Sequence, residues 1–111
     1  MVKAGFNRGG GVDTLDNEIC RFLIRNRLCS SEEEFSHRYL GRCRSYFGAV
    51  KSLGKGASIE SLVILNERLK LTQAQLERLG QNEMANVLAL YSASLSSMIT
   101  TKCIEGISLT Q

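Results

Sequence analysis

The chain has no proline, no tryptophan and a single histidine, and aromatic residues make up only 6% of its 111 positions. Aliphatic residues supply most of the apolar mass, so that hydrophobic residues account for 43% of the chain and charged residues for 23%. This balance is ordinary for a folded soluble domain and too apolar for a disordered chain. Because an aliphatic core with few aromatics favours helices over a β-sandwich or barrel, we expect an all-α protein.

Long hydrophobic runs are also scarce. Charged or amide side chains interrupt the apolar stretches, and we expect no segment to reach the about 20 residues that span a bilayer. The first residues, MVKAGFNRGGGVD, contain no continuous hydrophobic region of the kind found in secretory signals. We therefore expect a cytoplasmic protein with no membrane partner.

Close cysteine pairs are absent, because Cys20, Cys29, Cys43 and Cys103 are widely separated. Metal knuckles use such pairs so that two thiolates from one turn reach the same ion. A ligand set completed by His37 stays open as an alternative, but we expect no metal, no cofactor and mostly buried, reduced thiols. The sequence has no phosphate-binding loop and no nucleophile beside a base, which predicts that the protein is not an enzyme. It also shows no pocket motif for a small-molecule effector.

Positive charge is concentrated in the first half of the chain. Ten basic and six acidic residues lie between the start and Lys55, whereas four basic and five acidic residues follow. The first half therefore carries a formal charge of +4 and the second half of −1. An asymmetry of this kind indicates an anionic partner for the first half.

Three segments are predicted along the chain. Residues 1–12 are rich in glycine and form a basic arm, residues 13–71 form a helical domain, and residues 72–111 form a C-terminal helical segment. Within residues 13–71 we expect four helices: one capped by Asp13 or Thr14, one from Ser31 with a capping box to Glu34, one from about residue 43 to 53, and one after Ser58. The third is expected to turn Phe47, Val50 and Leu53 inward. A brief helix capped by Thr72 and a longer one from Asn82 to about Ile104 are expected next.

The longer C-terminal helix contains apolar residues at alternating steps of four and three, a spacing typical of a coiled-coil seam. The seam consists of Met84, Leu88, Tyr91, Leu95 and Met98. Small residues on either side of it permit the close approach of another helix. These five residues are predicted to form a homodimer, although the same helix could instead fold back on its own domain.

A short helix, a turn at Gly41 and a second helix with a polar outer face have the layout of a helix-turn-helix unit. Together with the stretch GKGASIESLVILNERL, this segment resembles the Cro/phage-repressor-like (Xre-type) helix-turn-helix family over residues 14–71. The resemblance implies a four- to five-helix lambda-repressor-like domain followed by a C-terminal dimerisation helix. In this chain the segment FSHRYLG is one residue longer than the family's usual spacing, and Cys43 stands where that family has a Ser or Thr cap.

The resemblance further implies a sequence-specific regulator of transcription that binds double-stranded DNA, a dimeric repressor that reads an inverted repeat in a bacterial or phage nucleoid. The residues expected to contact DNA are Arg42, Arg44, Ser45, Tyr46, Gly48, Ala49, Lys51, Ser52, Lys55 and Arg38, with Arg8 and Lys3 from the arm. Gly48 is explained equally well by close approach to the groove or by tight packing of its helix. The alternative function is a protein-interaction module, of the antitoxin or adaptor kind, in which the basic face is incidental.

Overall fold

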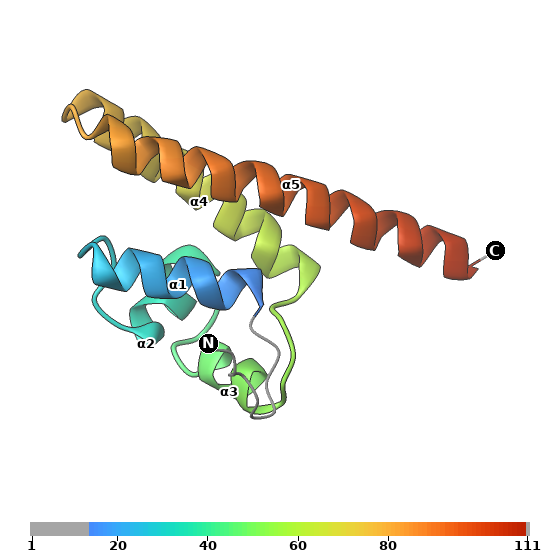
Figure 1. The fold of residues 1–111 in the computed structure, drawn as a ribbon. Helices are drawn as coiled ribbons and strands as arrows, with labels where there is room; N and C mark the ends of the chain where they lie inside the picture. The colour runs from blue at the N-terminus through green and yellow to red at the C-terminus, as the bar shows by residue number, and fades with distance from the viewer. Residues whose placement is uncertain (1–13, 111) are drawn as a thin grey trace, which may run out of the picture. The chain divides into compact units, whose positions relative to one another are not determined.

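The computed structural model describes the backbone of residues 14–110 and the side chains of residues 14–104. Lys3 and Arg8 of the expected basic arm lie outside this range. The described residues form five α-helices and one π-helix, and they contain no strand (Figure 1). The prediction of an all-α protein is confirmed. The chain divides into two units: one holds the residues up to Arg38 together with Arg42–Ala57, and the other holds Tyr39–Gly41 together with the residues from Ser58 onward.

The first unit begins with α1, Leu15–Arg25, which starts where Thr14 accepts a hydrogen bond from the amide of Asn17. Ile19, Cys20 and Leu23 form its buried stripe. The buried carboxylate of Asp16 accepts a hydrogen bond of 3.0 Å from the amide of Ala57. That bond ties the end of the unit back to its first helical turn.

The next helical segment combines a short α-helix with a π-helix. Ser31 caps α2, Glu32–Glu34, by accepting a hydrogen bond from the amide of Glu34, and the Glu34 carboxylate in turn accepts one from the amide of Ser30. The first bond confirms Ser31 as the cap, whereas Glu34 accepts from the amide of Ser30, one residue before the cap, and not from that of Ser31 as in a capping box. The backbone N–H of Ser30 holds the pKa of Glu34 down to about 2, so that Glu34 is ionised at neutral pH.

The π-helix η2, Phe35–Tyr39, follows without a break. A π-turn holds one more residue than an α-turn. The turn that follows depends on Gly41, whose φ of +67° is a left-handed conformation that residues with a side chain adopt only at a cost.

The third helix is shorter than expected. It was expected over residues 43–53, whereas α3 is Tyr46–Ser52. At its start, the carbonyl of Cys43 accepts a hydrogen bond from the amide of Tyr46, so Cys43, Arg44 and Ser45 form a turn instead of a helix. At its end, Gly54 takes a left-handed φ of +70°, and the amide of Lys55 bonds to the carbonyl of Val50. This pattern terminates helices.

The apolar side of α3 also differs from the prediction. Phe47 is fully buried, and its ring meets that of Phe35 edge to face with centroids 4.9 Å apart. Val50 is half-buried. Leu53, expected to point inward, is 68% exposed because it lies at the C-cap, beyond the last helical residue.

The second unit is a hairpin of two long helices. The helices α4, Ile59–Arg78, and α5, Asn82–Thr110, lie side by side and run in opposite directions (Figure 1). Ser58 caps α4 by accepting a hydrogen bond from the amide of Ser61. The break expected at Thr72 is absent, since α4 continues through this position. The Thr72 hydroxyl donates a hydrogen bond to the carbonyl of Arg68, one turn earlier in the same helix. That hydroxyl also lies 3.2 Å from the Tyr39 hydroxyl of the same unit.

The core of the hairpin corrects the expected dimerisation seam. Of its five residues, Leu88 and Leu95 are fully buried, in a helix that packs along α4. Met84, Tyr91 and Met98 beside them are half-buried. A heptad spacing indicates that a helix has a partner without indicating which one. Here α4 of the same chain takes that place, and Leu88 and Leu95 are not available to a second copy.

The structure also departs from the expectation that no segment could span a membrane. No charged residue lies between Glu83 and Lys102. Among the described residues, one helix, Asn82–Ile104, is long and apolar enough to cross a membrane by length and composition alone. A core helix that is mostly buried passes the same test, whereas 17% of this stretch is buried. Leu88 and Leu95 belong to the buried part.

Candidate nucleic-acid interface

A buried serine joins the two helical segments of the predicted helix-turn-helix. Ser36 in η2 is fully buried, and its hydroxyl donates a hydrogen bond of 2.5 Å to the carbonyl of Cys43. The same oxygen accepts a hydrogen bond of 3.2 Å from the amide of Phe47, which lies in the first turn of α3. The amide of Arg42 bonds to the carbonyl of Ser36. These bonds set the start of α3 against η2, together with the Phe35–Phe47 ring contact.

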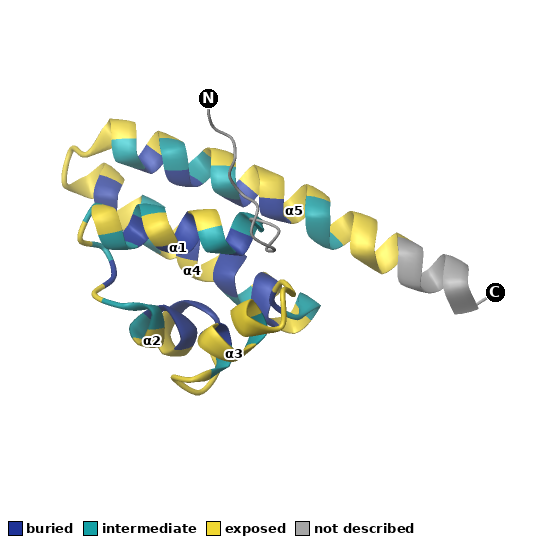
Figure 2. Ribbon diagram, turned by 60° about the horizontal axis from the view of Figure 1, so that its bottom comes forward, coloured by how far each residue is buried: buried dark blue, intermediate teal, exposed yellow. Residues whose placement is uncertain are grey.

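The outer side of this turn and helix is exposed. The exposed residues among those expected to contact DNA are Arg38, Arg42, Arg44, Ser45, Gly48, Ala49, Lys51, Ser52 and Lys55, while Tyr46 is half-buried. They come from a single continuous segment (Figure 2). A Cβ added at Gly48 would meet nothing within 4 Å. Tight packing of α3 therefore does not explain this glycine, and the explanation that involves an external surface remains.

Two of the expected cations are paired with the acids of α2. Lys51 donates to the carboxylate of Glu32, and its ammonium lies 5.5 Å from the centre of the Phe47 ring. Arg38 donates to Glu34 over 3.1 Å. Both pairs are exposed, so each contributes little to stability. They nevertheless reduce the positive charge that Lys51 and Arg38 offer to an outside ligand.

The cations of the turn and the following loop are in a different environment. Residues 35–59 include no aspartate or glutamate. The guanidinium of Arg42 lies 5.0 Å from the centre of the Tyr46 ring, a cation–π contact that orients it. Within residues 14–104, neither Arg44 nor Lys55 has a carboxylate within 4.0 Å. Arg44 and Lys55 therefore carry positive charge that no carboxylate of this range pairs with.

The thiols divide into two pairs. Cys20 and Cys29 are buried, as expected, whereas Cys43 and Cys103 are exposed. Burial raises the pKa of Cys20 to about 12, and burial also raises that of Cys29. A hydrogen bond with the Ser45 side chain lowers the pKa of the exposed Cys43. Within residues 14–104, no three His, Cys, Asp or Glu side chains come together as metal ligands.

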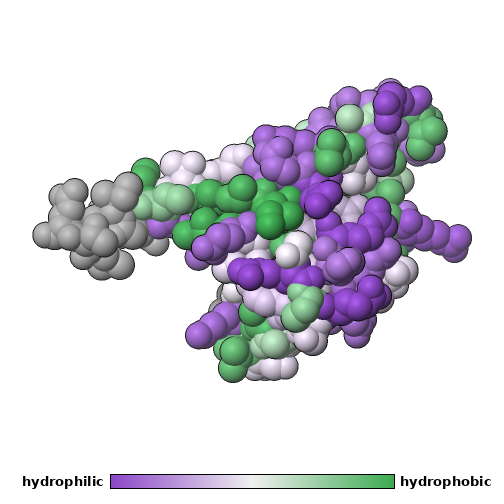
Figure 3. Space-filling view, turned by 180° about the vertical axis from the view of Figure 1, so that it is seen from behind, coloured by the Kyte–Doolittle hydropathy of each residue, from purple (hydrophilic) through white to green (hydrophobic). Residues whose placement is uncertain are grey.

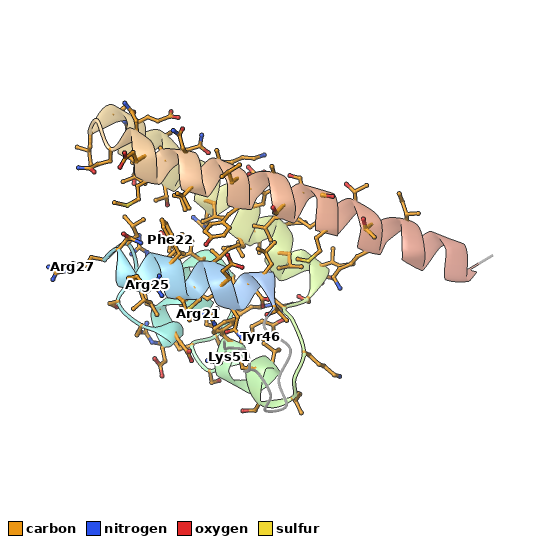
Figure 4. The ribbon with its side chains drawn as sticks, viewed as in Figure 1. Arg21, Phe22, Arg25, Arg27, Tyr46 and Lys51 are labelled. Carbon is orange, nitrogen blue, oxygen red and sulfur yellow. The ribbon has the colours of Figure 1, made fainter. Side chains whose placement is uncertain are left out.

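The arginines of α1 and of the turn that follows it were not among the residues expected to contact DNA. Arg21, Arg25 and Arg27 are all exposed in the same unit as α3 (Figure 4). Their residue type and their place outside the apolar stripe were visible in the sequence. Which surface of the folded unit they share depends on how α1 packs, and a spacing rule does not supply that.

A family model matches residues 17–108 of the chain, and it describes a family of unknown function, DUF6626. No curated protein and no solved structure matches the chain. Because the matched range includes nearly all of the 111 residues, the chain belongs to the DUF6626 family.

Proposed function

We propose that the protein binds double-stranded DNA through the turn and outer face of α3 and regulates transcription, as a dimeric repressor that occupies an inverted repeat. The observation that carries the proposal is the acid-free segment 35–59, in which Arg42, Arg44 and Lys55 are exposed around a short helix. Phosphates are the most abundant ligands for such a surface, and base edges in the major groove are the ligands of a helix that enters it.

The exposed residues of α3 are small or basic. Gly48, Ala49 and Ser52 leave the backbone of α3 open to close approach, and Lys51 lies beside them. A major groove about 12 Å wide accepts a helix with short side chains on its leading face. Arg42 and Arg44 precede the first turn, where forked guanidinium groups can reach guanine or phosphate.

Arg44 is the single best test of this placement. We expect Arg44→Ala to weaken binding to a site selected from random duplexes by about tenfold, because a guanidinium contact to a base edge is worth roughly 1–3 kcal/mol. Arg78→Ala is the matched control, since Arg78 is an exposed arginine of α4 and likewise has no carboxylate within 4.0 Å among residues 14–104. Fluorescence anisotropy with labelled duplexes measures both. Equal losses for the two variants, or no enrichment of any sequence by selection, would refute sequence-specific binding by α3.

The substitution Gly48→Ala is expected to raise stability and to lower DNA affinity. Because its Cβ position is open, Gly48→Ala is expected to stabilise α3 by up to about 1 kcal/mol. The same methyl group would stand between α3 and the groove, and we expect DNA affinity to fall about fivefold or more. Urea denaturation and anisotropy measure the two effects. Gly48→Ala with increased stability and unchanged affinity would show that α3 does not approach the duplex at this position.

The alternative function, a protein-interaction module, differs in its response to salt. A protein that neutralises several phosphates releases counterions, so its affinity for DNA falls steeply as salt is added. An adaptor of the antitoxin kind shows no salt-dependent binding to duplex DNA. The exposed Leu53 at the end of α3 is the feature that favours a protein partner.

A further inference from the structure

The helix α5 has a second, uncharged seam on the side away from α4. Its buried side consists of Ala85, Leu88, Ser92 and Leu95. The opposite side consists of Val87, Leu90, Ser94, Ser97, Thr101 and Ile104, which follow one another at steps of three and four. We name these six residues the outer seam. Leu90 is 69% exposed and Ile104 57% exposed, and the three seam residues between them are exposed as well.

The outer seam lies on a helix that is poorly suited to face water. Between Glu83 and Lys102 the helix carries no charge. Only 17% of this apolar stretch is buried inside the chain. Hydrophobic side chains also gather on the opposite face of the molecule from the one seen in Figure 1 (Figure 3). An uncharged seam of this length indicates a partner.

The outer seam has an apolar β-branched residue at each end, Val87 and Ile104, and two serines in its middle. If two copies of α5 run antiparallel about an axis between Ser94 and Ser97, each position meets a seam position of the other copy, as the a and d layers of an antiparallel coiled coil do. The layers pair Val87 with Ile104, Leu90 with Thr101, and Ser94 with Ser97. Val87 and Ile104 therefore meet at both ends, Leu90 meets a threonine in the next layer, and serines meet in the middle. A two-fold interface requires this kind of self-complementarity.

We propose that a second copy of the chain covers the outer seam in this antiparallel register. The small central residues permit the two backbones to approach closely, and the serine hydroxyls can hydrogen-bond across the axis. The interface uses none of the four buried side chains of α5, so the hairpin stays intact when the dimer forms. Binding of DNA by the first unit is not assumed in this inference.

A lipid bilayer is the other surface that could cover the outer seam, and the charged side chains of α4 disfavour it. Along α5 lies α4, whose exposed side chains include Glu60, Glu67, Arg68 and Lys70. Inserting α5 would bring these charges into hydrocarbon, which costs several kcal/mol for each. The hydroxyls of the outer seam gain partners from a second helix, whereas lipid chains offer none.

The size of the seam predicts a weak dimer. From Val87 to Ile104 the helix rises about 26 Å, and a contact strip of that length buries on the order of 1,000 Å² in total. Specific interfaces start at about 1,200 Å², so we expect a dissociation constant in the micromolar range. Sedimentation equilibrium of the full chain between about 1 and 200 μM covers that range.

The substitution Leu90→Glu tests whether the outer seam is the dimer interface. Because it brings a carboxylate into the apolar end of the seam, we expect the dissociation constant to rise about 30-fold or more. Leu71→Glu is the matched control, because Leu71 is 60% exposed on α4, outside the outer seam, and we expect no change in dimerisation. A wild-type chain that is monomeric throughout, or a dimer that both variants leave equally intact, would overturn the proposal.

The register is tested by a pair of charges. Ser94→Glu and Ser97→Lys are each expected to weaken the dimer, since each single charge faces a neutral hydroxyl. The double variant is expected to restore it, because in the antiparallel register the carboxylate introduced at position 94 faces the ammonium introduced at position 97 of the second copy. A double variant weaker than either single variant would reveal a parallel pairing and overturn the register. Flotation of monomeric chain with phosphatidylcholine–phosphatidylglycerol vesicles, abolished by Leu90→Glu, would assign the seam to a membrane instead.

Discussion

Ser36→Ala is expected to lower the free energy of unfolding of the first unit by about 2–4 kcal/mol. The hydroxyl of Ser36 is fully buried and holds both the carbonyl of Cys43 and the amide of Phe47. Alanine removes both bonds, and each buried polar group left without a partner costs roughly 1–3 kcal/mol. The carbonyl of Cys43 keeps its bond to the amide of Tyr46, which places the larger share of the loss on Phe47.

Hydrogen exchange of the α3 amides measures this loss locally. We expect their protection to fall by about 30-fold or more in Ser36→Ala, since about 1.4 kcal/mol corresponds to a factor of ten. Ser52→Ala is the control, because Ser52 is an exposed serine of α3 and its substitution is expected to change stability by less than about 0.5 kcal/mol. If Ser36→Ala and Ser52→Ala exchange alike, Ser36 does not hold α3 in place.

The largest functional effect is expected from neutralising the turn and loop cations together. We expect the variant Arg42→Ala, Arg44→Ala, Lys55→Ala to bind duplex DNA about 100- to 1,000-fold more weakly at about 0.1 M salt, if each contact contributes on the order of 1 kcal/mol. The slope of log affinity against log salt should decrease in steepness by about 3, because three fewer counterions are released. Titrations at several salt concentrations give both quantities.

A variant of equal charge separates local contact from net charge. Arg68→Ala, Lys70→Ala, Arg78→Ala removes three exposed cations from α4. Non-specific attraction to the whole protein would respond to both triple variants alike, because it depends on net charge. The proposed interface requires the first triple variant to lose at least about tenfold more affinity than the second. No salt-dependent binding by the wild-type chain would refute the proposed function, and it would leave the dimer of the outer seam untouched.

Local chemistry made the helix starts predictable. Thr14, Ser31 and Ser58 each cap a helix through a hydrogen bond to an amide three residues on, and such bonds depend on adjacent residues alone. Gly41 was recognised as a turn residue for a similar reason, since a left-handed φ is a property of one residue. The exposure of the basic segment also followed, because charged side chains without a buried partner stay in water.

The ends of the helices and the residues that they contact were harder to predict from the sequence. The stretch from Cys43 to Ser45 has nothing in its own composition that prevents a helix, and it forms a turn where the buried hydroxyl of Ser36 binds the Cys43 carbonyl. Lys51 was expected to be available to DNA, but it is paired with Glu32, which lies 19 residues earlier in the chain. Pairings over such distances depend on how helices pack, and residue spacing does not report them.

The sequence by itself determined that this protein is helical, where its capped helices begin and which segment carries unbalanced positive charge, because these properties arise from neighbouring residues. Only the tertiary structure decided that α4 continues through Thr72, that Leu88 and Leu95 pack on α4, and that the opposite side of α5 stays exposed. An apolar seam has the same spacing whichever helix covers it. Its partner is therefore set by the fold of the whole chain.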